Sequence, residues 1–305
     1  MEIGAMVNLG DKAGLDGVVA QVRALADAGL STAWFPQVLS SDALTVMAVA
    51  GREVPGIALG TGVIPTWPRH PMVLAGQALT TQVACGGRLI LGVGLSHQLV
   101  IEGMMGIPFA RPVVHMREYL TVLRALIHDG TVDFAGDTLR ANTLMSPIRV
   151  PGATPFPILV AALGPAMVRL AGEMSEGTLT WMGGRSVIEN RIAPAIREAA
   201  AAAGRPGPQV VVGLPVSVTA DVDAARERAA RTFAIYGNLP SYRRLLDEEK
   251  VEGPAGVAVV GDEESVAAQI RGFLDAGATG FLAGPFGSAP EREATIRLLG
   301  ELARS

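Results

Sequence analysis

Charged residues and cysteine are both scarce in this chain. Charged side chains make up 18% of the 305 residues, with 25 Lys and Arg against 29 Asp and Glu, which gives a formal net charge of −4. Because no surplus of cations is available to hold a phosphate polymer, we expect no nucleic-acid partner. The single cysteine, Cys85, cannot form an internal disulfide, and with four histidines no Cys/His metal cluster is expected. A reducing, cytoplasmic environment fits this composition.

Long apolar runs and aromatic residues are also lacking. No uninterrupted apolar stretch approaches the roughly 20 residues of a membrane span, although the mean hydropathy is +0.36. The first residues contain no basic segment followed by an apolar one, so we expect neither secretion nor membrane contact. Aromatic residues are 5% and hydrophobic residues 49% of the chain, so the core must be built from Ala, Val and Leu. This composition excludes a disordered or fibrous protein.

Short apolar runs alternate with helical patterns along the whole chain. Strands are predicted at 2–8, 32–35, 57–64, 88–93, 158–162, 178–182, 210–218 and 279–283, with helices between them. Gly29, Gly177 and Gly277 each stand where a helix needs a left-handed residue before the next strand. Eight strands alternating with helices over about 300 residues favour an α/β fold, a (β/α)8 TIM barrel.

The predicted barrel is a single domain over residues 1–305. An insertion is expected after the fourth strand at about 95–112, and a hairpin at about 130–141. A doubly wound open sheet is the alternative fold. It is disfavoured because the third glycine position of a dinucleotide fingerprint, after Gly92 and Gly94, holds His97.

The chemistry of a barrel lies at the carboxyl ends of its strands and on the loops that follow. In this chain those positions hold amides, hydroxyls, glycines and aromatics at 8, 37, 61–63, 94–97, 162–164, 180–182, 219 and 284–286. They include no carboxylate pair, nucleophile elbow or Walker loop. Such a set suits a planar cofactor that carries the reactivity itself. Apolar pocket walls are expected from 95–112, 141–157 and 236–256.

Glycines at these strand ends can serve either a ligand or the fold. Gly62 would let the main chain approach a flat ring closely, but relief of crowding in a buried strand is an equal alternative. Gly92 and Gly94 carry the same ambiguity. Small residues at 161–164 precede a helix opened by Pro165, so free N–H groups there suit a phosphate, with an ordinary loop as the alternative.

His97 is the candidate proton carrier, because it follows a strand end and an imidazole can exchange a proton near neutral pH. The alternative is a structural loop histidine. Structural roles are expected for His70 at a helix start, for His115 and His128 as solvated or satisfied helix residues, for Trp34 and Trp181 in strands, and for a buried, unreactive Cys85.

Several motifs follow one another along the chain: AWFPQ at 33–37, GTGVIP at 60–65 with RHP at 69–71, GRLILGVG at 87–94, VAALG at 160–164, VVGDE at 259–263 and DAG at 275–277. In this order they resemble the bacterial luciferase-like superfamily, and within it the actinobacterial branch that uses the deazaflavin coenzyme F-420. The resemblance covers nearly the whole chain. It implies a barrel with an insertion after strand four and a homodimer.

The resemblance also implies which residues touch the cofactor. A non-proline cis peptide behind its central ring would fall at Gly62-Val63. The phosphate would lie on the backbone amides of Ala162, Leu163 and Gly164, and near Gly177 and Thr178. Further cofactor contacts are assigned to Gln37, Thr61, Gly92, Gly94, Gln98, Ala161 and Trp181.

One departure from the family pattern bears on the reaction. Relatives that oxidise alcohols or sugar phosphates carry an Asp-His pair after strand two and a Glu after the strand-four glycines, whereas this chain has Gln37-Val38 and Leu95. Alcohol oxidation is therefore disfavoured. We expect hydride transfer from the reduced deazaflavin to an activated C=C or C=N bond of an apolar or peptide-borne substrate. Gln37 would bind the ring or substrate, and His97 or Ser96 would relay the proton.

Two other functions stay open at this point. One is an FMN-dependent monooxygenase of the same fold. The other is a barrel that binds flavin without turnover, which the sparse set of acids and bases supports.

Overall fold

Eight parallel strands close into a barrel in the computed structural model, which describes residues 2–9, 14–37, 39 and 41–305. Each barrel strand pairs with the next, and the pairing of the last strand with the first closes the ring. The strands are β1 (Glu2–Met6), β2 (Thr32–Phe35), β3 (Ala58–Thr61), β5 (Leu89–Gly94), β8 (Ile158–Ala161), β9 (Gly177–Trp181), β10 (Gln209–Val218) and β12 (Gly280–Pro285). The predicted (β/α)8 barrel is confirmed.

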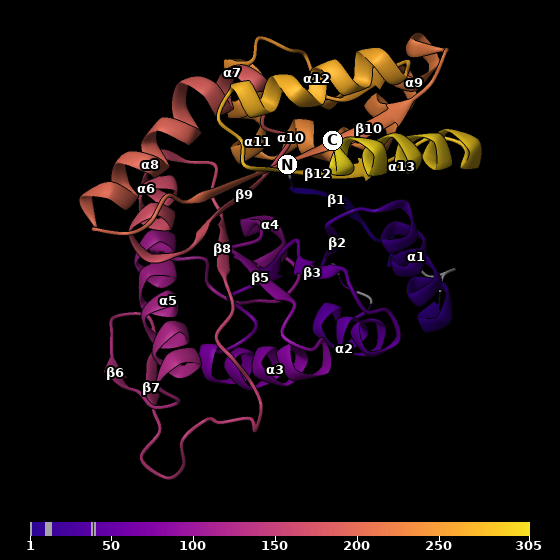
Figure 1. Cartoon of the computed structure of the whole chain (residues 1–305). Helices are drawn as coiled ribbons and strands as arrows, with labels where there is room; N and C mark the ends of the chain where they lie inside the picture. Colours follow the sequence, from indigo (N-terminus) through magenta and orange to yellow (C-terminus); the bar gives the residue numbers. More distant parts are fainter. Residues whose placement is uncertain (1, 10–13, 38, 40) are drawn as a thin grey trace.

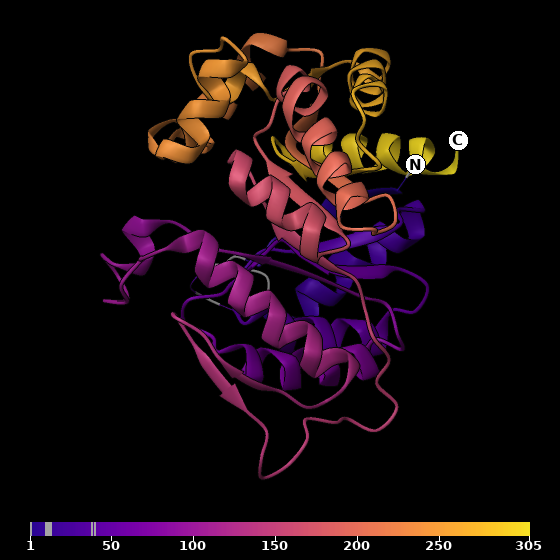
Figure 2. The same ribbon diagram turned by 90° about the vertical axis from the view of Figure 1, so that its left-hand side faces the viewer.

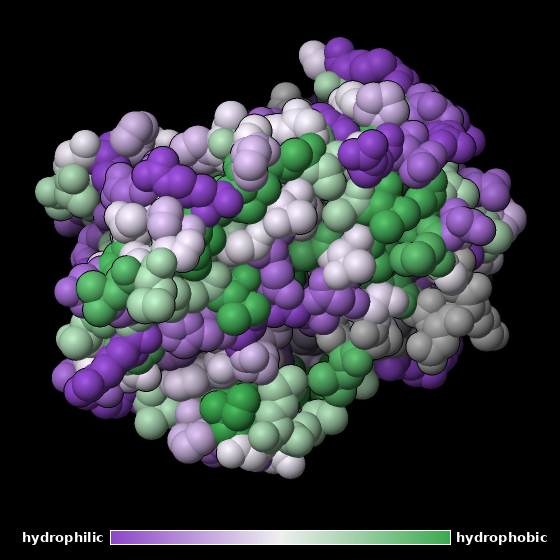
Figure 3. All heavy atoms as spheres, turned by 90° about the horizontal axis from the view of Figure 1, so that it is seen from below, coloured by the Kyte–Doolittle hydropathy of each residue, from purple (hydrophilic) through white to green (hydrophobic). Residues whose placement is uncertain are grey.

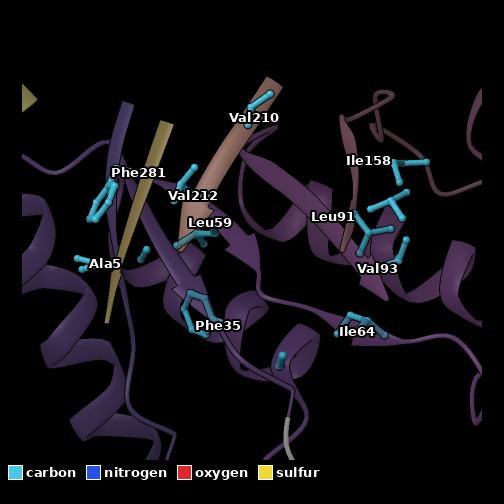
Figure 4. Close-up of a cluster of buried hydrophobic side chains, with 14 of the residues drawn as sticks. Ala5, Phe35, Leu59, Ile64, Leu91, Val93, Ile158, Val210, Val212 and Phe281 are labelled. Carbon is cyan, nitrogen blue, oxygen red and sulfur yellow. The ribbon is translucent and has the colours of Figure 1, made fainter. Parts of the chain in front are cut away.

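Helices surround the barrel on its outside (Figure 1 and, turned by 90°, Figure 2). The main ones are α1 (Gly14–Ala28), α2 (Ala43–Glu53), α3 (Pro71–Ala84), α5 (Pro112–His128), α6 (Pro165–Met174), α8 (Ala193–Ala202), α12 (Glu263–Asp275) and α13 (Ala289–Arg304). Side chains on the outer faces of the strands, such as Phe35, Leu91 and Phe281, are buried beneath this layer (Figure 4). Aliphatic side chains form most of this core, as the composition predicts.

Local signals at helix ends are largely confirmed. Gly29 and Gly277 follow α1 and α12 with φ of 90° and 100°, in the left-handed region. His70 is the N-cap of α3, and Pro71 is its first residue. The expectation for Gly177 is wrong, because α6 ends at Met174 and Gly177 is already the first residue of β9.

Two short strands extend the sheet beyond the eight predicted ones. The predicted strand at 57–64 is divided into β3 and β4 (Ile64–Pro65), and β4 pairs with β5. Strand β11 (Val259–Gly261) pairs with the last residues of β10. The smaller helical pieces are α4 (Gln98–Ile101), α7 (Arg185–Val187), the π-helix η1 (Ile188–Ile192), α9 (Val222–Thr232), α10 (Ala234–Asn238), α11 (Pro240–Glu248) and the 3-10 helix η2 (Pro254–Gly256).

The predicted hairpin forms as β6 (Asp133–Ala135) and β7 (Arg140–Asn142), an antiparallel pair. Its tip is held by the Glu118 carboxylate of α5, which accepts hydrogen bonds from the backbone N–H groups of Asp137, Thr138 and Leu139 at 2.7, 2.8 and 3.2 Å. Burial would raise the pKa of Glu118, but these bonds and the Thr138 hydroxyl outweigh it and lower that pKa.

The segment 141–157 does not form a pocket wall at the carboxyl ends of the strands, so that expectation is wrong. Its Thr154 accepts a hydrogen bond from Gln82 at 3.0 Å, and the Gln82 side chain in turn accepts one from the N–H of Leu89, the first residue of β5. The segment therefore runs past the amino end of the barrel. Among the described residues, no helix is both long and apolar enough to cross a bilayer.

Candidate active site

The barrel interior is filled by a small apolar cluster below the carboxyl ends of the strands. Its buried members are Trp34, Leu159, Leu179, Val211 and Leu282. A Cβ atom placed on Gly62 would lie 3.7 Å from side-chain carbons of Leu179 and Leu282, which is ordinary contact. Gly62 therefore lies against this cluster with room for a methyl group, whereas a larger side chain would be pressed against Leu179 and Leu282.

Gly62 belongs to a bulge between β3 and β4, and the Gly62-Val63 peptide is cis as the resemblance implies. The bulge is fixed to β5 by side-chain and backbone bonds. The fully buried Thr61 hydroxyl donates to the Gly92 carbonyl and accepts from the Gly92 N–H, both at 2.8 Å. Beyond β4, the Thr66 N–H donates to the Gly94 carbonyl at 2.9 Å. Thr61 is thus a structural link between two strands.

Gly92 and Gly94 are needed for close packing. A Cβ on Gly92 would lie closer than 3.0 Å to the Thr61 carbonyl oxygen and to Val63, and one on Gly94 would lie 2.7 Å from Val63 and 3.0 Å from Ala161. Of the two interpretations left open by the sequence, strand packing explains both glycines. These two glycines could affect a bound cofactor only by fixing the position of Val63.

The loop between β8 and α6 offers donors to an anion. Gly164 is the N-cap of α6 without a side-chain cap, and a Cβ placed on it meets nothing within 4 Å. The first N–H groups of a helix lack internal partners and carry the positive end of its dipole. Arg191, from η1, donates to the Leu163 carbonyl at 2.5 Å and pairs with Glu248 at 2.8 Å. Its Nη2 is buried, with no hydrogen-bond partner among the described residues.

Gly177 and Thr178 are not at this end of the barrel. Both lie at the amino end of β9, where the Thr178 hydroxyl donates to the Val160 carbonyl at 2.8 Å and Gly177 packs against the backbone of Gln209. The carboxyl end of the same strand is Trp181. The structure therefore does not bring Gly177 and Thr178 to Ala162, Leu163 and Gly164, and the expectation that all five meet one phosphate is wrong.

His97 follows β5 and is the N-cap residue of α4. The preceding Ser96 has φ of 59°, in the left-handed region that is uncommon for residues other than glycine. The His97 ring lies 5.6 Å from the ring of Tyr242, on α11. Burial lowers the pKa of His97, so its imidazole is mostly neutral at pH 7.

Aromatic side chains from distant segments continue from His97 across the strand ends. Tyr242 packs edge-on against Tyr236 at 4.9 Å, and Tyr236 against Trp181 at 6.1 Å. Phe233 then contacts Trp181 at 6.3 Å and Phe286 at 5.6 Å. Burial raises the pKa of both tyrosines, so they keep their hydroxyl protons at neutral pH. We call Trp181, Phe233, Tyr236, Tyr242 and Phe286 the aromatic wall.

The aromatic wall is mostly missing from the sequence-based predictions, although 236–256 was expected to line the pocket. The sequence does contain a signal for the wall: aromatic residues are scarce, yet three of the 14 Phe, Trp and Tyr residues lie between 233 and 242. Trp181 is half-buried at the end of β9, which suits both core packing and ligand contact.

Gln37 and Gln98 were predicted to contact the cofactor, but the side chain of each forms a hydrogen bond within its own segment. The Gln37 side chain accepts from the Ala43 N–H at 2.9 Å, which fixes the start of α2. Gln98 is exposed and donates to Glu102 at 2.7 Å on the surface of α4. Val38, which the sequence paired with Gln37, lies outside the described residues.

A second cluster of polar side chains lies beyond β4. It includes His115, and its contacts show that the expectation for His115 was wrong. His115 is 6% exposed and stacks on Trp67 with ring centroids 3.7 Å apart and planes at 8°. Its Nε2 lies 3.0 Å from the Thr66 hydroxyl, but its Nδ1 is buried without a hydrogen-bond partner among the described residues. His115 is therefore neither solvated nor fully satisfied, whereas His128 is exposed as expected.

Arg69 joins this second group through its backbone. The Tyr119 hydroxyl donates to the Arg69 carbonyl at 2.7 Å, and the Arg69 guanidinium pairs with Asp42 at 2.6 Å. Asp42 is also the N-cap of α2. Phe109, in the insertion after β5, lies 5.3 Å from the Trp67 ring. Loops that follow three different strands are thus joined at the carboxyl end of the barrel.

The family of luciferase-like monooxygenases matches residues 2–280. Uncharacterized proteins of Mycobacterium tuberculosis and Mycobacterium bovis are 30% identical over 226 residues, which cover 68% of this chain but only 65%, less than two thirds, of those proteins. The 5,10-methylenetetrahydromethanopterin reductase of Methanopyrus kandleri is 26% identical over 323 residues, covering 92% of this chain and 91% of that protein.

Solved structures agree on the fold. The coenzyme F-420-dependent tetrahydromethanopterin reductase of Methanopyrus kandleri has a TM-score of 0.84 at 23% identity, covering 98% of this chain and 97% of that chain. A type II Baeyer-Villiger monooxygenase of Pseudomonas putida in complex with FMN has a TM-score of 0.76 at 17% identity, covering 99% and 98%.

Proposed function

This chain belongs to the luciferase-like monooxygenase family, and we propose that it is an oxidoreductase dependent on coenzyme F-420. In this proposal hydride passes from the reduced deazaflavin to an activated C=C or C=N bond of an apolar or peptide-borne substrate. The observation that carries the proposal is the Gly62-Val63 bulge, where Gly62, which has no side chain, lies against an apolar cluster below the carboxyl ends of the strands. A flat, largely apolar ring fits such a surface.

The residues at the mouth of the barrel fit the rest of such a cofactor. Its phosphate would be held by the backbone amides at the start of α6, after Ala162, Leu163 and Gly164, with the Arg191 guanidinium beside them. Ala161 and Trp181 end the neighbouring strands β8 and β9. When bound, a reduced deazaflavin supplies the hydride, so the protein has to supply position and one proton.

The residues around the ring site support reduction of the substrate rather than its oxidation. Leu95 packs against the hydrophobic core and cannot act as a base, and Gln37 holds its own loop. His97 is mostly neutral at pH 7, and with the adjacent Ser96 it can pass a proton from water to the other atom of the C=C or C=N bond, the one that does not receive hydride. Removal of a hydroxyl proton, which alcohol oxidation requires, has less support. The apolar aromatic wall favours an apolar substrate.

Equilibrium titration with F-420 and with FMN tests the proposal. We expect F-420 to bind and the Gly164→Asp variant to lose at least tenfold in affinity, equivalent to about 1.4 kcal/mol, because its carboxylate would repel the phosphate. Gly207→Asp is the matched control, since Gly207 is exposed on another loop with nothing within 4 Å of its Cβ. Tight FMN binding without F-420 affinity would contradict the proposal.

An FMN-dependent monooxygenase is the second candidate, supported by the likeness to the FMN-containing monooxygenase fold. Oxygen uptake coupled to substrate conversion distinguishes it from the reductase. A flavin-binding barrel without turnover is the third, and it would be favoured if a bound cofactor reduces no enone or imine.

We also propose that the protein works as a homodimer in the cytoplasm. Val49 of α2 and Val73 and Val83 of α3 are 38%, 53% and 40% exposed, so these two adjacent helices leave apolar side chains outside the core. Figure 3 shows the molecule from the side on which α2 and α3 lie in Figure 1, where hydrophobic and hydrophilic side chains are mixed. Sedimentation equilibrium at micromolar concentration should give twice the mass of 31.6 kDa.

A further inference from the structure

We propose that Glu248, on α11, is a positioning residue for the cofactor phosphate. It holds the guanidinium of Arg191 beside the β8–α6 loop, so that binding of the phosphate and the position of α11 over the strand ends strengthen each other. The inference rests on the proposed function, because it takes the start of α6 as the phosphate site.

The Arg191 side chain connects the β8–α6 loop to α11 through different nitrogen atoms. Its Nη1 donates to the Leu163 carbonyl at 2.5 Å, and its Nε donates to the Glu248 carboxylate at 2.8 Å. The third nitrogen, Nη2, is buried and has no hydrogen-bond partner among the described residues. Because the guanidinium is planar, the first two bonds also fix the direction of Nη2. Arg191 therefore keeps one oriented donor in reserve next to the loop.

Arg191 is placed by an uncommon backbone feature. It lies in the π-helix η1, where the Ala193 N–H bonds to the Ile188 carbonyl, five residues earlier instead of four. Such a turn contains one extra residue and occurs frequently at functional sites. Since η1 continues directly from α7 into α8, the extra residue changes which side chains of this long helix face the β8–α6 loop.

The end of α11 is held by two neighbouring carboxylates. Next to Glu248, the Glu249 carboxylate accepts a hydrogen bond from the Val187 N–H of α7 at 2.6 Å. Gly184 makes room for this contact, because a Cβ there would be closer than 3.0 Å to the Glu249 side chain. α7 has no side-chain cap at its own N-cap residue, so Glu249 satisfies one of the free N–H groups of its first turn. α11 is thus fixed to the helix that carries Arg191.

The same α11 reaches the candidate proton carrier. Its Tyr242 contacts the His97 ring at 5.6 Å and the Tyr236 ring at 4.9 Å. The six residues of helix from Tyr242 to Glu248 span about 9 Å. α11 therefore joins the loop after β5 to the loop after β8, and whatever fixes its end also fixes part of the aromatic wall.

The coupling follows from the sharing of one guanidinium. When Nη2 holds a phosphate, the Arg191 side chain is less free to move, so breaking its bond to Glu248 becomes less favourable. In return, Glu248 restricts Arg191 before the phosphate arrives and so reduces the entropy that binding costs. Thermodynamic linkage requires the two effects to be equal in size. A rigid fork of five donors can serve both partners at once.

Titration with inorganic phosphate tests the positioning role, because a charge that only repels the anion predicts the opposite sign. Removing such a negative charge would strengthen phosphate binding. For Glu248→Ala we expect a loss of at least about fivefold in phosphate affinity, the lower end of typical couplings between sites. Asp247→Ala is the matched control, since it removes the same charge one residue earlier, where Asp247 pairs with Arg243 at 2.9 Å within α11. Its phosphate affinity should be unchanged or slightly higher.

Hydrogen exchange of the α11 amides measures the other side of the coupling. Saturating phosphate should slow this exchange at least about fivefold in wild type and Asp247→Ala, but not in Glu248→Ala. Arg191→Lys is a second variant, which keeps a cation but cannot hold Leu163 and Glu248 in one fixed geometry, and it should also lose the effect of phosphate. Unchanged or stronger phosphate binding by Glu248→Ala, or equal slowing of exchange in Glu248→Ala and wild type, overturns the inference.

F-420 titration of the same samples separates this inference from the proposed function. If F-420 binds equally to wild type and Glu248→Ala, the positioning role alone is removed. If F-420 does not bind but phosphate behaves as expected, the cofactor assignment fails and the positioning of Arg191 by Glu248 remains. If wild type binds no phosphate, the inference is overturned whatever the result with F-420.

Discussion

Gly92 lies on β5 and Gly62 in the bulge that follows the neighbouring strand β3, but the structure predicts opposite outcomes for the same substitution at these two positions. In Gly92→Ala the new methyl group would be closer than 3.0 Å to the Thr61 carbonyl oxygen and to Val63. The strands cannot separate easily, because the Thr61 hydroxyl bonds to both the N–H and the carbonyl of Gly92. In Gly62→Ala the methyl group would meet Leu179 and Leu282 at 3.7 Å, without overlap.

The magnitudes follow from these contacts. Overpacking of a tight core costs about 1–3 kcal/mol, and a clash with backbone puts Gly92→Ala at the upper end. The unfolding entropy of a chain this long is about 0.6 kcal/mol/K, so a loss of about 3 kcal/mol lowers Tm by about 5 °C. Gly62→Ala should change Tm by no more than about 2 °C, because its lower unfolded-state entropy is worth only about 0.4–1 kcal/mol.

Differential scanning calorimetry measures the Tm values, and F-420 titration measures binding. We expect Gly62→Ala to fold normally but to bind F-420 less tightly, because its methyl group would add bulk at the proposed ring surface beside Leu179 and Leu282. Equal Tm losses for the two variants would refute the packing argument. Unchanged F-420 affinity in Gly62→Ala would refute the placement of the ring.

Three further predictions concern titratable groups. Glu118→Ala should destabilise the protein by about 2–3 kcal/mol, because several hydrogen bonds to its carboxylate are lost. Hydrogen exchange should become faster at the backbone amides of the β6–β7 tip, and unchanged exchange rates would contradict this role of Glu118. Glu291 has its pKa lowered to about 2, first by the Ser288 hydroxyl in the cap of α13. Its stabilising effect is therefore complete above the unfolded value of about 4.3 and is lost as the pH falls toward 2, so the Tm difference between wild type and Glu291→Gln should be largest at neutral pH and vanish near pH 2. Burial raises the pKa of Cys85 to about 11, so a thiol reagent at pH 8 should react only after unfolding, and rapid reaction of the native protein would show an open thiol.

The fold could be predicted because its signals are local. Apolar runs and glycines such as Gly29 and Gly277 mark strands and helix ends within a few residues. Strands β4 and β11 were missed because two or three residues are too short to show a period. The place of 141–157 was predicted wrongly because only tertiary contacts, such as that of Thr154 with Gln82, send this segment to the amino end of the barrel.

The candidate site was predictable only where it lies directly on a strand end. Gly62, Ala162 and Gly164 could be named from their place after an apolar run. The burial of His115 depends on Trp67, which is distant in the sequence, and nothing in the surrounding helix pattern reports it. Tyr242 likewise reaches His97 only because α11 folds over the strand ends.

In this barrel, several residues of the motifs that resemble the family are required for close packing. Trp34 fits in the interior because the strands on either side carry Gly4 and Gly60, where a Cβ would be closer than 3.0 Å to the indole. Gly92 is required for the same kind of reason. Such residues indicate the fold and the proposed surface for a flat ring. The same residue types are expected at these positions in reductases and in monooxygenases.

Residues outside the motifs must therefore carry the choice of reaction and substrate. Apart from Trp181 at the end of β9, the aromatic wall lies on loops and helices that follow the strands, where a fixed scaffold leaves the sequence free to vary. In the proposed function, the aromatic wall favours an apolar substrate. If so, Tyr236→Ala in the aromatic wall should change which substrates react while F-420 affinity stays the same, and Gly62→Ala should lower F-420 affinity without changing which substrates react.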